Sequence, residues 1–194
     1  MTTSLDTGLF LPDPEPSEIS YTIISVDDHV VAPPHIFKEY MQPQLRDLGP
    51  QLIETDQGHQ VWEFEGATYS QVGMNAVAGR KPETVKVEPF RFEQMRPGCY
   101  DIDARVKDMD IGGIWAMLNF PSQITGFCGT VFAKAENHEV GIDAVRAWND
   151  WIFTEWYSKY PERVIPGGIT YLGDSDEAVR EIHRNAERGF VSVT

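Results

Sequence analysis

Cysteine is scarce in this sequence: Cys99 and Cys128 are its only two cysteines among 194 residues, which excludes a scaffold built on disulfides. No apolar run reaches the roughly 18 residues of a membrane-spanning helix. The first 30 residues contain no Lys or Arg, so a secretory signal is not expected. These absences together predict a cytoplasmic protein, because few cysteines suit a reducing compartment.

Basic residues are also few, since 16 Lys and Arg stand against 30 Asp and Glu and give a net charge of -14. Such acidity argues against nucleic acid and anionic membrane surfaces as partners, and a small-molecule substrate is the expected ligand. The composition is otherwise that of a globular protein, with 41% hydrophobic and 24% charged residues. The length suffices for one domain with a substantial core.

The chain divides into an N-terminal arm over residues 1–19, which is polar and rich in proline, and a domain over residues 20–194. The domain begins with a β-prone segment at about 20–28. An insertion over about 30–100 then follows, and its alternating residues 60–68 predict a β-hairpin.

After residue 100 the sequence alternates regularly between helical and extended patterns. The predicted elements are a helix at 101–113, a strand at 114–118, a helix at 137–160, a strand at 164–170, a helix at 174–189 and a strand at 190–194. Such alternation builds an α/β fold with parallel strands and outer helices. Together with the β-prone segment at about 20–28, these are four strands. They fit either a small doubly wound domain or the first half of a (β/α)8 barrel, which typically needs about 250 residues.

A D-x-H motif stands where the first predicted strand ends, with Asp27 and His29 two residues apart. Successive side chains on a strand point to opposite faces, so these two side chains are expected to project from the same side. A carboxylate and an imidazole at this spacing supply half of a four-ligand site for a divalent metal. Asp28 is expected to face the helix layer and to have a structural role.

Several further segments, taken in order with this motif, resemble the amidohydrolase-related family, the branch that contains aminocarboxymuconate-semialdehyde decarboxylase and related aromatic-acid decarboxylases. The matching segments are Ser25–Val30, Gly73–Arg80, Met95–Asp101, Leu118–Ser122 and Phe127–Gly129. The resemblance covers about residues 20–194. It implies the first half of a metal-dependent (β/α)8 TIM barrel with a β-hairpin-containing insertion after the first strand.

The resemblance also implies roles for individual residues. The family's first-strand ligand pair maps onto Asp27 and His29, and its remaining ligands, a His after a middle strand and an Asp after the last strand, would lie beyond Thr194. The implied cofactor is a divalent ion, Zn2+ or Mn2+, and a carboxylate in the first pair suits Mn2+. The acid-base groups of catalysis are expected in the other half, so this chain offers no assigned catalytic residue.

Three side chains near the ends of the later strands are candidates for substrate contact, namely Asn119, Phe120 and Tyr171, although packing against a neighbouring loop explains them equally well. No other histidine ends a predicted strand, and exposed or capping roles are expected for His35, His59, His138 and His183. If the chain stood alone, His138 would be the candidate to complete the metal shell.

Three functional hypotheses remain open at this point. The first is a metal-dependent enzyme that acts by decarboxylation or hydrolysis on a small carboxylate-bearing, amide or ester substrate. The second is a non-catalytic subunit or fragment that completes a barrel with a second polypeptide or as a homo-oligomer. The third is a four-stranded binding module without metal, in which replacing Asp27 and His29 by alanine changes nothing.

Overall fold

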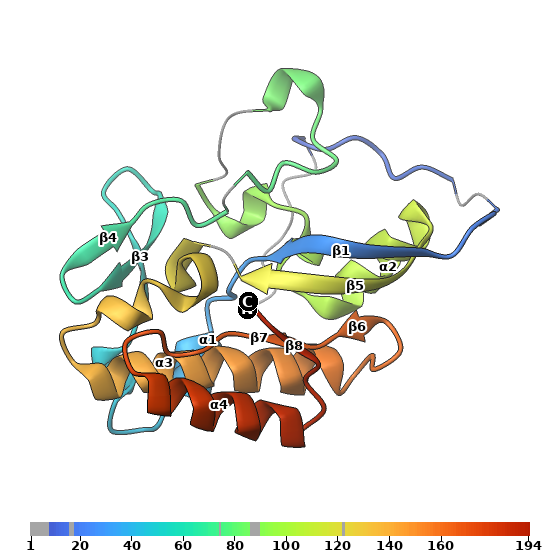
Figure 1. Ribbon diagram of the computed structural model, residues 1–194. Coiled ribbons are helices and arrows are strands. Elements are labelled where there is room, and N and C mark those ends of the chain that lie inside the picture. The colour runs from blue at the N-terminus through green and yellow to red at the C-terminus, as the bar shows by residue number, and fades with distance from the viewer. Residues whose placement is uncertain (1–7, 16–17, 74, 86–89, 122) are drawn as a thin grey trace.

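Parallel strands form the centre of the molecule in the computed structural model, which describes residues 8–15, 18–73, 75–85, 90–121 and 123–194 (Figure 1). Strands β1 (Ile23–Val30) and β5 (Ile114–Pro121) lie side by side and run parallel, and β6 (Val164–Ile165) continues the same sheet beyond β5. Strands β7 (Gly167–Gly168) and β8 (Ser192–Val193) pair in the same parallel sense. The strands therefore follow one another in chain order.

The predicted strand at 164–170 is two short strands, β6 and β7, separated by Pro166. Proline has no N–H to donate to a ladder, so pairing changes partner at this residue. β6 pairs with β5 before the proline, and β7 pairs with β8 after it. The prediction of one continuous strand is therefore wrong in detail.

The main helices begin where their capping residues predict. Asp101 accepts a hydrogen bond from Ala104 N at 2.8 Å and starts α2 (Ile102–Gly112), and Gly113 ends this helix at a φ of 70°. Side chains of Asn137 and Asp174 cap α3 (His138–Trp151) and α4 (Ser175–Glu187) in the same way. α3 continues as one π-helical segment, Ile152–Tyr157, so the helix predicted at 137–160 changes its hydrogen-bond pattern in its last third.

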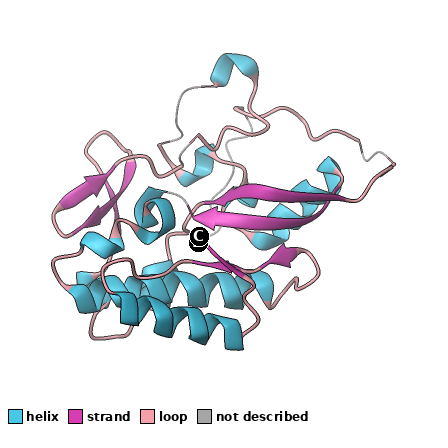
Figure 2. Cartoon of the chain, in the orientation of Figure 1, coloured by secondary structure: helices cyan, strands magenta, loops and turns pink. Residues whose placement is uncertain are grey.

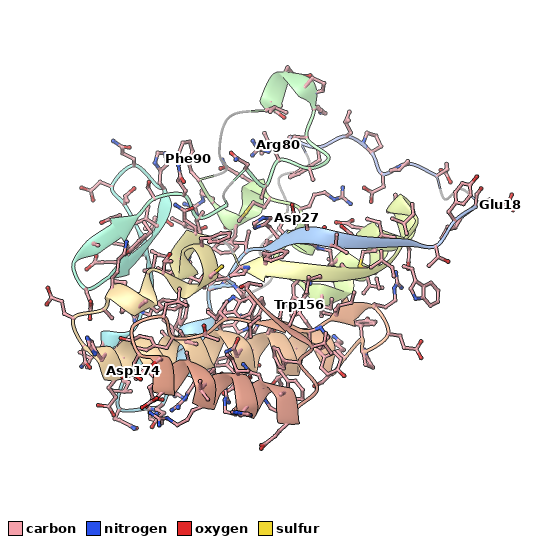
Figure 3. All side chains as sticks on the ribbon, viewed as in Figure 1. Glu18, Asp27, Arg80, Phe90, Trp156 and Asp174 are labelled. Atoms are coloured by element: carbon pink, nitrogen blue, oxygen red, sulfur yellow. The ribbon has the colours of Figure 1, made fainter. Side chains whose placement is uncertain are left out.

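Large aromatic side chains fill the space between the parallel strands and the helices, as Trp156 illustrates in Figure 3. Trp148, Trp151 and Trp156 are all buried, and consecutive rings meet edge-on at centroid distances of 6.2 and 5.7 Å. Edge-to-face pairs of this kind are favoured by the ring quadrupole. This tryptophan cluster belongs to the same hydrophobic core as Met117 of β5.

The insertion carries a second, antiparallel sheet (Figure 2) made of β2 (Gln51–Glu54), β3 (Gln60–Phe64) and β4 (Ala67–Tyr69). Glu65 and Gly66 join β3 to β4, both at positive φ, as a tight two-residue turn requires. β2 was not among the strands predicted from the sequence. The remaining helical pieces are α1 (Ile36–Tyr40) and 3-10 turns at Arg46–Leu48, Pro82–Thr84, Phe92–Gln94, Pro97–Cys99, Gln123–Thr125, Phe127–Gly129 and Phe132–Lys134.

Part of the predicted N-terminal arm lies along the insertion. Phe10 forms a β-bridge with Arg80, and Leu11 N donates to Gly79 O at 2.8 Å. Residues 1–7 and 16–17 of the predicted arm lie outside the described residues.

Both cysteines are free thiols, as the sequence indicates. Within the described residues, no helix has the length and apolar character that a membrane crossing requires.

Candidate metal centre

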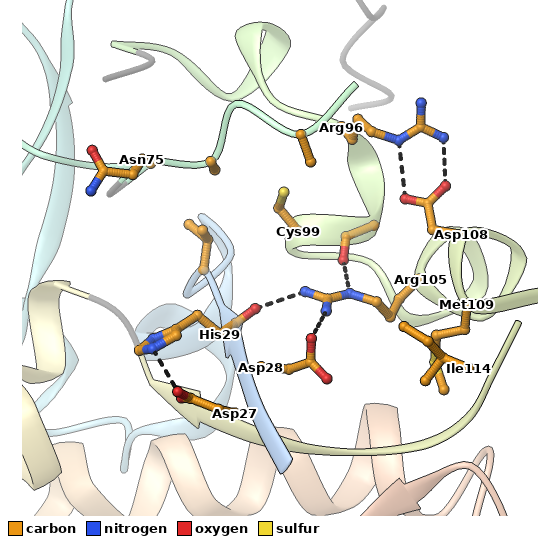
Figure 4. A pocket seen from close by; sticks show the side chains of 15 residues that line it. Asp27, Asp28, His29, Asn75, Arg96, Cys99, Arg105, Asp108, Met109 and Ile114 are labelled. Carbon is orange, nitrogen blue, oxygen red and sulfur yellow. Dashed lines mark hydrogen bonds and ion pairs between the residues drawn. The ribbon is translucent and has the colours of Figure 1, made fainter. Parts of the chain in front are cut away.

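Asp27 and His29 lie on the same side of β1, with Asp27 Oδ1 3.8 Å from His29 Nε2 (Figure 4). Their side chains are exposed, at 85% and 52%. Two oxygen or nitrogen ligands of one tetrahedral zinc ion lie about 3.4 Å apart, given bond lengths of about 2.1 Å. The observed spacing is too long for a hydrogen bond and close to that ligand separation, so the pair fits a shared divalent ion.

A bulge in β1 sets up this arrangement. Ser25 is paired with Met117 of β5, whereas Asp28 is paired with Asn119. Between these two pairs β1 advances by three residues and β5 by two. The extra residue is the signature of a β-bulge, a feature that re-aims side chains and is common near active sites. Asp27 therefore lies in an irregular part of the strand, where its direction depends on what holds the strand end.

Asp28 points to the other side of the strand, toward α2, as strand alternation predicts. Arg105 of α2 approaches it, with Nη1 3.6 Å from Asp28 Oδ1. Arg105 Nη2 also donates to the main-chain oxygen of His29 at 2.7 Å. Arg105 was not among the predicted site residues, because an arginine inside a helix gives no sequence signal of the strand that it contacts.

A cavity of about 510 Å³ adjoins the end of β1 and reaches from Asp27 and His29 to the Arg105 side of α2. Arg96 and Cys99, from the 3-10 turn region before α2, line the same space. Burial raises the pKa of the Cys99 thiol above its ordinary value, which keeps it protonated.

The three candidates for substrate contact occupy different surroundings. Phe120 is level with His29 on the adjacent strand, and the two ring centroids are 6.1 Å apart. Asn119 is level with Asp28 and only 2% exposed, and both of its amide atoms are buried without a partner among the described residues. Tyr171, at 1% exposed, is part of the hydrophobic core. Of these three, the structure therefore brings only Phe120 beside His29, and a substrate role for all three stays a prediction.

Within the described ranges, no third His, Cys, Asp or Glu joins Asp27 and His29 in a group of potential ligands. His138, the candidate for a chain standing alone, lies at the start of α3 beside Tyr171, with ring centroids 6.2 Å apart. Asp27 and His29 are thus a pair of candidate ligands without a third member in this part of the chain.

One other group has the composition of a metal site, formed by His35, Glu39 and Glu155. His35 Nε2 lies 2.8 Å from Glu155 Oε1, and Tyr40 donates to the same oxygen at 2.9 Å. Because direct hydrogen bonds already satisfy Glu155, an ion is not needed to explain the group. It connects α1 to the π-helical end of α3.

This connection predicts a pH-dependent stability. The hydrogen bond to Glu155 raises the pKa of His35 above its ordinary value of 6.5, although partial burial opposes the shift. A raised pKa means that the pair stabilises the fold fully below about pH 6.5 and loses this contribution as the pH rises through the folded-state pKa. Because the pair is partly exposed, the expected loss is under about 1 kcal/mol. Urea unfolding between about pH 6 and pH 9 should show that the free energy of unfolding declines with pH in the parent protein and not in His35→Gln. An equal decline of the free energy of unfolding in both proteins would contradict this prediction.

A scan of protein-family models and a search of curated proteins each found no match for this chain. Among solved structures, the fold places the chain with amidohydrolase and decarboxylase structures. It is similar to an amidohydrolase from Mycobacterium avium subsp. paratuberculosis K-10, with 21% identity and a TM-score of 0.66, over 91% of this chain and 50% of that one.

A second similar structure is 5-carboxyvanillate decarboxylase from Novosphingobium aromaticivorans DSM 12444, complexed with manganese and 4-hydroxy-3-methoxy-5-nitrobenzoic acid. The identity is 21%, the TM-score is 0.55, and the match covers 100% of this chain and 44% of that one. At these identities the likeness shows the fold. The chain spans about half the length of either structure.

Proposed function

We propose that this chain forms half of a metal-dependent (β/α)8 barrel in an amidohydrolase-like enzyme, which decarboxylates or hydrolyses a small carboxylate-bearing, amide or ester substrate. The observation that carries the proposal is the convergence of Asp27 and His29 at the end of β1. Active sites of such barrels lie at the carboxyl ends of the strands, which is where this pair stands.

The strand order supports a half-barrel over a small doubly wound domain. β1, β5 and β6 follow in chain order without the reversal that a doubly wound sheet contains. Apolar side chains are also exposed on the first parallel strand and at the last one, namely Ile23, Ile24 and Val26 of β1, Val193 of β8 and Val191 just before β8. Exposed apolar edge strands invite a neighbour, so we propose that further barrel strands cover them. A second polypeptide or a longer form of this chain would supply those strands.

Asp27 and His29 would hold the metal ion, which is Zn2+ or Mn2+ on the chemistry of the two ligands. The manganese in the 5-carboxyvanillate decarboxylase structure supports Mn2+ as the first ion to test. When bound, such an ion polarises a carboxylate or carbonyl oxygen, or lowers the pKa of a bound water. Phe120, next to His29, would give a planar substrate an apolar surface to pack against.

Because one similar structure is an aromatic-acid decarboxylase, an aromatic acid is the first substrate class to test. Because the other is an amidohydrolase, amides and esters are the second class to test. Two free cysteines suit a reducing compartment, and we propose the cytoplasm as the location.

Metal content and mass in solution test the proposal directly. We expect the isolated chain to bind Mn2+ or Zn2+ only weakly and to self-associate, because two ligands make an incomplete shell and the edge strands are uncovered. Adding the polypeptide that completes the barrel should produce one tightly held ion per site and should release CO2 from a hydroxybenzoate or hydrolyse an anilide. A well-folded monomer that tightly holds one ion by itself would contradict the half-barrel. Unchanged properties after Asp27→Ala and His29→Ala would contradict the metal site.

A further inference from the structure

We infer that Arg105 is the positioning residue of this centre: it holds the bulged end of β1 in the register that turns Asp27 and His29 toward one ion. The inference rests on the proposed metal-binding function and adds a residue that lies outside the ligand shell. Arg105 comes from α2, on the opposite side of β1 from the ligand side chains.

The Arg105 guanidinium makes contacts that converge on the strand end (Figure 4). Nη2 donates to His29 O at 2.7 Å, Nη1 lies 3.6 Å from Asp28 Oδ1, and Nε donates to Gly98 O. Its carbon Cζ lies 5.8 Å from the ring centroid of Trp156, which restricts the group from another side. The side chain is only 14% exposed. The planar Arg105 guanidinium thus connects the end of β1 to the 3-10 turn before α2 and to Trp156 in the core.

Two features of β1 weaken the register of its end, which the contacts of Arg105 would therefore need to stabilise. β1 is the outermost strand of its sheet within the described chain, and a bulge interrupts its pairing with β5 just before Asp28. A shift by one residue would send Asp27 and His29 to the helix side and Asp28 to the ligand side, because side chains alternate along a strand. Arg105 opposes this shift, since it binds the carbonyl of His29 and the carboxylate of Asp28 together.

The chain contains a matched control at the other end of the same sheet. Arg163 donates from Nε to Trp115 O and from Nη2 to Ile114 O, and it pairs with Asp110 at 2.7 Å. Its Cζ lies 5.9 Å from the Trp115 ring centroid, and the side chain is also mostly buried. Arg163 thus makes the same kinds of contact at the start of β5, whereas Asp27 and His29 lie at the end of β1.

The test compares Arg105→Met with Arg163→Met in the protein as isolated, including any partner that completes its barrel. Methionine keeps much of the side-chain volume and removes the donors and the charge. We expect both variants to lose similar thermal stability, but only Arg105→Met to weaken Mn2+ binding, by about 10- to 100-fold in calorimetric titration, the cost typical for lost support of a metal ligand. Arg105→Lys should fall between the parent and Arg105→Met, because lysine keeps the charge and lacks the planar fork.

A metal-free measurement complements the titration. Amide hydrogen exchange at Asp28, His29 and Val30 should accelerate at least about tenfold in Arg105→Met and stay unchanged in Arg163→Met, because only the first variant loosens the end of β1. Equal metal affinities in the two variants, or equal exchange rates at these amides, would overturn the positioning role.

The outcome also separates this inference from the proposed function. If the parent protein shows no Mn2+ or Zn2+ binding that depends on His29, the proposed metal site fails and this inference fails with it. If binding depends on His29 but is the same in both arginine variants, the metal site stands and only the role of Arg105 is wrong.

Discussion

Replacing His29 by alanine is expected to abolish metal binding and the activity of the completed enzyme. The variant removes one of the two ligands that we propose, and no described His, Cys, Asp or Glu forms a group of three potential ligands with Asp27 and His29. The affinity for Mn2+ should fall by more than the roughly 10- to 100-fold typical of lost outer-shell support. The rate should fall about a thousandfold or more, because metal-ion catalysis contributes several kcal/mol and each 1.4 kcal/mol is a factor of ten.

Metal content by mass spectrometry and the rate of CO2 release or amide hydrolysis measure this effect. His183→Ala is the matched control, since His183 is exposed on α4 and belongs to no described group of potential metal ligands. The control should retain full metal content and rate. An unchanged metal content in His29→Ala would show that the ion, if any, binds elsewhere. The group formed by His35, Glu39 and Glu155 would then be the next place to look.

Local chemistry explains which parts of the fold were predictable from sequence. The caps Asp101, Asn137 and Asp174 and the terminating Gly113 mark where helices begin or end, and the structure confirms those positions. Alternation along β1 correctly separated the direction of Asp28 from that of Asp27 and His29. These features depend on residues within a few positions of one another, so sequence spacing is enough to find them.

Features that depend on distant residues were missed. The contact of Arg105 with His29 O spans 76 positions, and nothing in the local pattern of α2 indicates it. The burial of Asn119 and Tyr171 follows from how the helices cover the sheet, whereas the sequence placed both near strand ends, where exposure is common. The bulge in β1 likewise arises from its register with β5, about 90 residues away, and single-strand alternation does not reveal it.

Glu181 illustrates how a distant contact can stabilise the strand ends. It is only 3% exposed on α4 and accepts hydrogen bonds from Asn149 at 2.7 Å and from Arg184 at 2.6 and 2.9 Å. Asn149 in turn donates to Ile169 O at 2.9 Å and accepts from Ile169 N at 3.0 Å. Glu181 therefore fixes the asparagine that holds the main chain just after β7.

Replacing Glu181 by alanine should destabilise the fold by about 3–5 kcal/mol, because it leaves the buried donors of Asn149 and the Arg184 guanidinium without their shared acceptor. Glu181→Gln should cost less, since an amide still accepts one bond in the same space. Glu187→Ala, at an exposed position of the same helix, should change stability by no more than about 0.5 kcal/mol. Urea unfolding of the four proteins measures these differences. A cost for Glu181→Ala as small as that for Glu187→Ala would mean that water or Asp150, which already pairs with Arg184, replaces the carboxylate and that the network does not hold the strand end.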